Sequence, residues 1–257
     1  MFERLQKPFL TVETGEAYQP IRISYNIHNL EELKKCLHKL KCLHKKDENG
    51  WNIFWGDECD HLQFESLDSY KRNPTHPLRL ATLLIKNNTL HLNLPSFKRA
   101  CLLVPLIHKL ISTELASIKR ADFINKVFGL SERLPHGFSE LFDENELEKI
   151  VEQRLHDYED VQTRCEQATT AEEAFQILAE YTNSESHKKL PYAERYAFQE
   201  TKDLDPEVAY LGFYIFLRGR ELVAIRRWFG ETGYTLADAA EETIEQVFGN
   251  MDIDIIE

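Results

Sequence analysis

Three cysteine–histidine pairs near the N-terminus are the first residues whose types and spacing indicate possible chemistry. They are Cys36-x-His38, Cys42-x-His44 and Cys59-x-His61. Thiolate and imidazole groups are the usual ligands of zinc, but structural zinc sites generally use C-x2-4-C spacing, which this chain lacks. A closed site would need His38, Cys42, Cys59 and His61 to converge, with the strand after the first helix docked beside that helix. The spacing therefore predicts no metal and no other cofactor.

The segment Asp57–His61 is a second candidate, because it holds three carboxylates, a thiol and an imidazole in consecutive positions. Hydrolytic metal sites use such groups, and a polar turn between two strands uses them as readily. Elsewhere the sequence contains no phosphate-binding loop, dinucleotide-binding glycine motif, nucleophile elbow or H-E-x-x-H motif. We therefore predict no catalytic residues and lean towards a protein that is not an enzyme. A metal-dependent hydrolase near Asp57–His61 remains an alternative.

Two groups of basic residues indicate binding rather than catalysis. The first lies on a helix predicted over residues 30–46, where leucines mark one face and lysines spread over the other. The second is the basic cluster of the C-terminal half. The candidate partner-binding residues are Lys34, Lys35, Lys39, Lys41, Arg218, Arg220, Arg226 and Arg227. A solvated surface explains the lysines equally well, and ion pairs with nearby carboxylates explain the arginines.

The charge of the chain changes sign between its halves. The net charge is −12, yet residues 1–129 carry 19 Lys+Arg against 14 Asp+Glu, and residues 130–257 carry 12 against 29. Binding to a polyanion favours basic surfaces and is weakened by salt. A nucleic-acid-binding protein that uses the lysine face of the 30–46 helix is therefore the first alternative function. The acidic half argues against tight binding of that kind.

The elements that must position these residues are clearest over residues 78–111. Asn87-Asn88 separates two strand-like runs, and asparagine tolerates the positive φ that a two-residue hairpin turn requires. In residues 89–94 leucines alternate with polar residues, which is typical of a strand with one buried face. Ser96 is expected to cap a buried apolar helix that Pro105 kinks or splits.

The rest of the N-terminal part predicts further strands and helices. A strand over residues 20–27 leads to Asn29, which caps the 30–46 helix. The other expected elements are one or two strands within 51–65, a loop over 66–77, a strand over 114–119 and a short helix over 122–128. Strands joined by short turns, with helices on one face, predict a layered α+β arrangement.

Helices dominate after a linker at residues 130–142. The expected helices run from a cap at Asp143 to about 167, from Thr170 to about 181, briefly after Pro191, over 208–229, and from Thr235 to about 248. The first two are joined by a short connection and should form an antiparallel pair. For residues 208–229 a hairpin turning at Arg218-Gly219 is the competing interpretation.

These patterns predict an α+β fold, with an N-terminal mostly antiparallel sheet and covering helices, followed by a mainly α-helical C-terminal region. We expect an α+β domain over residues 1–135 and an acidic helical domain over 136–257. The chain has no run of about 18 apolar residues that would span a membrane. It also lacks an apolar signal-peptide core, and its cysteines are scattered and odd in number. A cytoplasmic location follows.

The expected function is that of a non-enzymatic accessory or adaptor protein that acts through protein–protein interaction. The charge split, the missing catalytic motifs and an aromatic-rich stretch over 208–229 favour it. The expected partner is another protein. Nucleic acid is possible but not favoured, no membrane partner is expected, and self-association into a homo-oligomer stays open.

Overall fold

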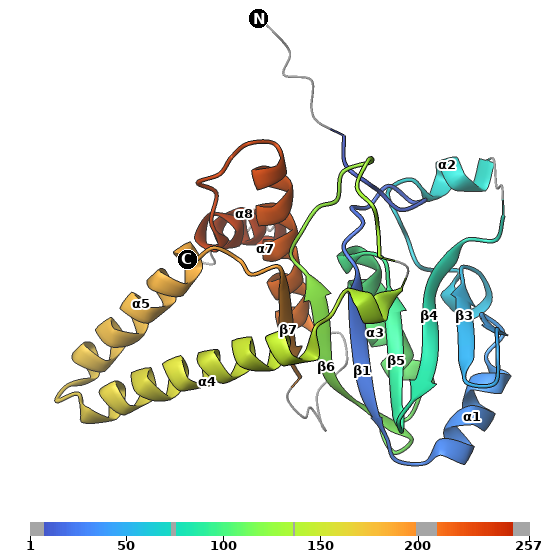
Figure 1. Ribbon diagram of the computed structural model, residues 1–257, viewed down its shortest axis with the longest axis horizontal. Helices are drawn as coiled ribbons and strands as arrows, with labels where there is room; N and C mark the ends of the chain where they lie inside the picture. The colour runs from blue at the N-terminus through green and yellow to red at the C-terminus, as the bar shows by residue number, and fades with distance from the viewer. Residues whose placement is uncertain (1–7, 73–75, 136, 199–209, 249–257) are drawn as a thin grey trace, which may run out of the picture. The chain divides into compact units, whose positions relative to one another are not determined.

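A computed structural model describes residues 8–72, 76–135, 137–198 and 210–248. Within these residues the predicted α+β fold is confirmed, with an antiparallel sheet in the N-terminal part and mostly helices in the C-terminal part (Figure 1). The strands follow the order β2-β3-β4-β5-β1-β6-β7 across the sheet. They are β1 (Ile21–Ile27), β2 (Leu43–Lys45), β3 (Gly50–Phe54), β4 (Arg79–Lys86), β5 (Thr89–Leu94), β6 (Ala116–Ile124) and β7 (Ala193–Ala197).

The helices of the described chain follow the caps that the sequence offers at most of their starts. They are α1 (Leu30–Lys39), α2 (Leu67–Arg72), α3 (Phe97–Leu110), α4 (Glu144–Gln167), α5 (Ala171–His187), α7 (Leu211–Trp228) and α8 (Leu236–Phe248). Two short 3-10 helices, η1 (Asp57–Cys59) and η2 (Phe138–Glu140), lie in loops. Within the described residues, no helix combines the length and the apolar character needed to cross a membrane.

The β4–β5 hairpin forms where the sequence predicts it. Asn87 and Asn88 have φ of 50° and 57°, the left-handed values that a two-residue hairpin turn needs. Ile85 pairs with Leu90, which sets the register in which the leucines of β5 face the core. The hairpin is thus the centre of the sheet.

The buried helix after the hairpin is also confirmed. The Ser96 side chain accepts a hydrogen bond from the backbone N–H of Arg99 at 3.2 Å, which satisfies one of the free donors at the start of α3. Pro105 lies inside α3 without dividing it. α3 packs against one face of the sheet (Figure 1), where the rings of Phe97 and Phe123 meet edge to face with centroids 5.7 Å apart.

Several expected elements are wrong in type. Of the one or two strands expected within 51–65, one forms as β3 and is followed by η1. The loop expected over 66–77 contains α2. The helix predicted over 122–128 is wrong, because β6 continues to Ile124 and pairs with β1 on one side and β7 on the other. Pairing on both edges supplies backbone hydrogen-bond partners for this end of β6 and overrides its weak helical pattern.

The short helix expected after Pro191 is likewise wrong, because Ala193–Ala197 forms β7 and pairs with β6.

The chain divides into two compact units. Unit 1 contains residues 1–142 and 193–214, and unit 2 contains residues 143–192 and 215–257. The chain therefore leaves unit 1, builds a helical hairpin and returns to add an edge strand. The boundary expected at residue 135 does not include this return, and the independence of the predicted domains stays a prediction.

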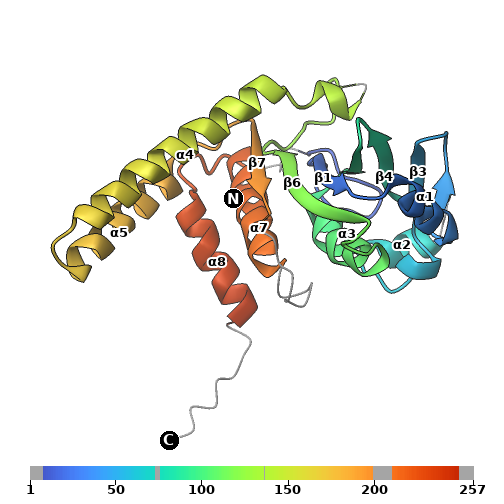
Figure 2. The ribbon, with the colours of Figure 1, turned by 90° about the horizontal axis from the view of Figure 1, so that it is seen from below.

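Unit 2 is helical, and α4 and α5 lie side by side as the predicted antiparallel pair (Figure 2). Asp143 and Thr170 cap them as expected, each accepting a backbone N–H of the first turn. α5 runs to His187, beyond the expected end near residue 181. α8 starts after Thr235, whose hydroxyl and backbone N–H each lie 2.7 Å from the Asp238 carboxylate.

The aromatic-rich stretch forms one helix, α7, and not a hairpin. In unit 2 the part of α7 around Leu222 and Val223 packs on Ala239 of α8 to make a small apolar core. The helix start expected at Asp205-Pro206 lies outside the described residues.

Candidate functional site

The candidate lysines of the N-terminal part do not share one helix face. α1 ends at Lys39, so the helix predicted over 30–46 is wrong in its second half, and residues 43–45 form β2 instead. Lys34 and Lys39 lie on α1, and Lys35 on the same helix pairs with Glu32 at 2.7 Å. Lys41 lies in the turn after the helix.

The carboxylate of Glu58 explains why α1 stops. It accepts the backbone N–H groups of Lys41 at 3.1 Å and Cys42 at 2.9 Å, which a continuing helix would use internally. Burial opposes ionisation of Glu58, but these N–H groups outweigh it and lower its pKa to about 2. The carboxylate that ends the helix therefore comes from a residue 16 positions after Cys42.

The structure brings together only part of the candidate metal-binding set. The thiols of Cys42 and Cys59 are buried, and the neighbouring Cys59 thiol together with burial raises the pKa of Cys42. His38 instead packs against the Trp51 ring, and His61 is exposed beside Asp60. Among the described residues no group of three or more His, Cys, Asp or Glu side chains has the arrangement of a metal site.

The arginines of α7 have neighbours within unit 2. Arg218 pairs with Glu221 at 2.6 Å, and Arg226 pairs with Glu242 at 3.1 Å. Arg227 donates a hydrogen bond from Nε to a backbone carbonyl at the start of α8, and Arg220 is buried. The Arg218 pair lies within α7, whereas the Arg226 and Arg227 contacts hold α7 to α8 and to Tyr234 just before it. These ion pairs are in keeping with the ion-pair interpretation of this cluster.

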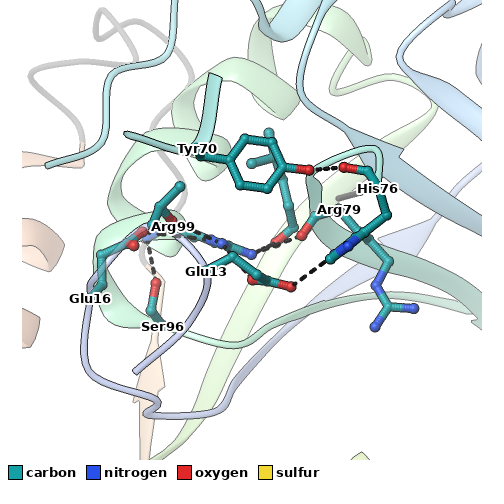
Figure 3. Close-up of polar contacts among 9 residues, drawn as sticks. Glu13, Glu16, Tyr70, His76, Arg79, Ser96 and Arg99 are labelled. Carbon is teal, nitrogen blue, oxygen red and sulfur yellow. Dashed lines mark hydrogen bonds and ion pairs between the residues drawn. The ribbon is translucent and has the colours of Figure 1, made fainter. Parts of the chain in front are cut away.

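Arg99 of unit 1 has several partners, and the sequence did not single it out. Its side chain is only 1% exposed. Nη1 donates to the carbonyl oxygen of Arg79 at 2.8 Å, and Nη2 donates to Glu13 at 3.2 Å and to the Thr14 hydroxyl at 3.0 Å (Figure 3). Nε lies 3.6 Å from Glu16. Arg99 thereby joins the hook of residues 8–19 to β4 and α3.

A cavity of about 490 Å³ adjoins this cluster. Residues of the hook, β4, Asn93, Arg99 and Phe138 line it. The charge of Arg99 is already offset by Glu13 and Glu16, while the guanidinium of Arg79 points away from the cluster (Figure 3).

A row of polar residues crosses the sheet on the face opposite α3. Thr82, Asn93, Arg22, Asp122 and Arg195 are successive cross-strand partners on β4, β5, β1, β6 and β7. Arg22 Nε donates to Asn93 Oδ1 at 2.9 Å, and Arg195 Nε donates to Asp122 Oδ1 at 2.6 Å. Buried Asp122 is thus held by hydrogen bonds, and this row tightens the strand pairing.

The α4–α5 pair of unit 2 leaves large apolar side chains uncovered. Leu155 and Tyr158 of α4 are 57% and 56% exposed, and Phe175 and Leu178 of α5 are 74% and 45% exposed. Sequence patterns place these residues on apolar stripes, where burial is the simple expectation. In unit 2 the stripes are wider than the contact between two helices, so their outer residues stay in solvent.

Helix geometry places these four residues on one face of the pair. Buried Val161 and partly buried Asp157 mark the inner side of α4, and partly buried Ala174 and Ile177 mark that of α5. Cys165 of α4 donates to the Ala174 carbonyl of α5 at 3.6 Å. Viewed from the N-terminus of each helix, Leu155 and Tyr158 of α4 are rotated clockwise from these inner positions. Phe175 and Leu178 of α5 are rotated clockwise from theirs by similar angles. In an antiparallel pair the same sense of rotation brings both sets to the same face.

Polar residues that precede the contact positions confirm this geometry. Arg164, Gln167, Glu173, Gln176 and Glu180 line one shallow pocket together, which requires that equal offsets on the two helices share a face. None of the four exposed apolar residues lines that pocket. The α4–α5 pair therefore has a polar face and an apolar face. The four residues Leu155, Tyr158, Phe175 and Leu178 are named the apolar stripe.

Carboxylates border the apolar stripe. Three glutamates neighbour Leu155 along α4. Glu148 lies seven residues before it, Glu152 three residues before it and Glu159 four residues after it. Residues 143–187 carry 13 Asp+Glu against 3 Lys+Arg. The apolar stripe therefore lies in a strongly negative field.

No family model matches the sequence, and no curated protein or solved structure shows significant similarity to it.

Proposed function

We propose that the protein is a non-enzymatic, cytoplasmic accessory protein that binds another protein through the apolar stripe of α4 and α5. The observation that carries this proposal is the exposure of four large apolar side chains on one face of a helical pair. Contiguous apolar surface of this kind is typical of interaction sites, whereas isolated exposed leucines are ordinary. None of the five cysteines, all of which lie in the described residues, forms a disulfide, in keeping with a reducing compartment.

The carboxylates around the apolar stripe select the chemistry of the partner. A helix with an apolar face and basic flanks would bury its apolar face on Leu155, Tyr158, Phe175 and Leu178, and its lysines or arginines would meet the glutamates of α4. Helix-in-groove recognition commonly combines apolar anchors with such complementary charges. Binding should weaken with salt, because the flanking charges remain solvated.

The test compares two matched double variants of the full-length protein. Leu155→Ser/Phe175→Ser removes two members of the apolar stripe, and His156→Ser/Gln176→Ser changes the neighbouring positions outside it. Partners are isolated by cross-linking in native cells, and each candidate is then purified and titrated. The proposal expects a partner with a basic amphipathic segment, whose affinity falls about tenfold or more in the stripe variant and little in the control.

Four results would overturn the proposal. The first is a partner that binds both variants equally, and the second is cross-links confined to unit 1. The third is a native protein that sediments as a monomer without partners. A concentration-dependent dimer that the stripe variant abolishes would assign the apolar stripe to a second copy of the chain and would also overturn it.

A further inference from the structure

A second feature of unit 2 is a cavity of about 670 Å³ formed by α4, the end of α5, the segment after it, α7 and the start of α8. The cavity differs in charge from the rest of its unit. Its basic lining residues are Lys149, Arg154, Lys188, Lys189 and Arg220.

The concentration of basic residues there is far from the average. Unit 2 contains nine Lys+Arg and 22 Asp+Glu, and five of those nine basic residues line the cavity against three of the 22 acidic ones. The acidic lining residues are Glu146, Asp157 and Glu185. A concave site lined by one sign of charge concentrates ions of the opposite sign. The cavity therefore favours anions inside a unit that repels them elsewhere.

The ion pairs of the cavity leave cations available. Lys188 pairs with both Glu185 and Asp157, so one lysine occupies two of the three carboxylates. Asp157 also accepts a hydrogen bond from Gln153 Nε2 at 2.8 Å. Lys149 and Lys189 are exposed, and neither has a side-chain partner among the described residues. These two ammonium groups are free to meet a ligand.

The lining of the cavity also includes a buried guanidinium and several apolar side chains. Arg220 is buried, its Cζ lies 3.4 Å from the centroid of the Phe216 ring, and Nη1 donates to the Phe216 carbonyl at 3.4 Å. A stacked guanidinium loses little freedom when it binds an anion. Ile150, Leu190 and Leu236 give one side an apolar surface.

We propose that this cavity binds a small organic polyanion, with phosphate or clustered carboxylate groups held by Lys149, Lys189 and Arg220 and an apolar part against Ile150 and Leu236. Its volume matches the range of small-molecule sites, about 300–1,000 Å³. The site is separate from the apolar stripe, and its existence does not depend on the proposed protein partner.

The test measures binding of pyrophosphate and of citrate to the full-length protein by isothermal titration calorimetry at constant ionic strength. Two variants are compared with the unchanged protein. Lys149→Gln/Lys189→Gln removes the free cations of the cavity, and Arg164→Glu on the outer part of α4 makes the same change in net charge outside it. All substituted residues are exposed, so both variants should fold, as circular dichroism would verify.

The expected result is saturable binding of at least one anion at one site per chain. Pyrophosphate alone would assign phosphate chemistry, citrate alone would assign clustered carboxylates, and both would assign polyanions in general. The cavity variant should bind about tenfold or more weakly, because charge-assisted hydrogen bonds are lost. The Arg164→Glu variant should keep most of the affinity. Absence of saturable binding to either anion, or equal losses in the two variants, would overturn the proposal.

Discussion

The guanidinium of Arg99 lies 3.2 Å from the carboxylate of Glu13, a residue 86 positions earlier in the chain. This contact and the Glu16 pair fix an N-terminal hook that has little regular structure of its own. Replacement of Arg99 with Met should lower the free energy of unfolding by about 3–5 kcal/mol, because buried Glu16 is left without its cation. Chemical denaturation measures the change.

Arg79→Met is the matched control for that experiment. The Arg79 side chain is exposed and points away from the cluster, and only its backbone carbonyl contacts Arg99 (Figure 3). Its substitution should change stability by less than about 0.5 kcal/mol. Equal effects of the two substitutions would contradict the role given to Arg99.

Glu58 should make stability depend on acid pH. Its folded-state pKa of about 2 lies below the ordinary value of 4.5, so its ionised form stabilises the fold above pH 4.5. That contribution is lost as the pH falls from 4.5 through about 2. Glu58→Gln should cost about 2 kcal/mol near neutral pH, since hydrogen bonds to a charged acceptor are replaced by weaker ones. The difference from the unchanged protein should disappear in acid.

Asp60→Asn provides the comparison for Glu58, because Asp60 is exposed and has no such backbone bonds among the described residues. Unfolding curves from pH 2 to 7 should be parallel for this variant and the unchanged protein. A Glu58→Gln variant that kept the full acid dependence would show that other carboxylates cause it.

The five thiols should separate into two classes of reactivity. Cys42 and Cys59 are buried, and the neighbouring Cys59 thiol together with burial raises the pKa of Cys42. Thiolates are the reacting species and the reagent must reach them, so Cys42, with its raised pKa, and buried Cys59 should react at least about tenfold more slowly than Cys36, Cys101 and Cys165. Timed alkylation at pH 8 followed by mass spectrometry measures each rate. In denaturant all five thiols should react at similar rates. Similar rates for all five in the native protein would contradict the prediction that Cys42 and Cys59 are protected.

His108 should remain neutral to a lower pH than an exposed histidine. Burial lowers its pKa below 6.5, and its Nδ1 lies 2.8 Å from the Tyr210 hydroxyl. Burial also raises the pKa of Tyr210 to about 12, so the hydroxyl keeps its proton and can donate it. Because the unfolded state binds the proton more readily, stability should fall as the pH drops through 6.5.

Nuclear magnetic resonance titration of the His108 ring tests this directly. Tyr210→Phe should raise the midpoint, because the neutral imidazole then loses its hydrogen-bond donor. A midpoint at or above 6.5 in the unchanged protein would contradict the prediction.

The elements that the sequence predicts correctly are those with a local cause. Asn87-Asn88 can adopt left-handed φ, Ser96 and Asp143 can cap helices, and each of these residues acts within four positions of itself. The end of α1 is different, because the groups that stop it come from Glu58. A distant carboxylate leaves no mark on the helical pattern of residues 30–46.

The candidate sites show the same division. The apolar stripe of α4 and α5 is visible in the sequence as apolar spacing, yet spacing alone does not tell a buried outer residue such as Phe175 from an exposed one. Arg99 and Glu13 are 86 residues apart, and Asp122 and Arg195 are 73 residues apart, so only the fold brings each pair together. A role in partner binding stays a prediction for the four lysines Lys34, Lys35, Lys39 and Lys41.

The position of β7 at the end of an excursion through α4 and α5 also affects how the protein must be made. Unit 1 cannot complete its sheet until residues 143–192 have been synthesised, which takes some seconds at roughly 5–20 residues per second. During that interval the outer edge of β6 has no neighbour and is open to pairing with other chains. The length of the helical excursion thus sets how long each nascent chain is exposed to aggregation, independently of how stable the finished protein is.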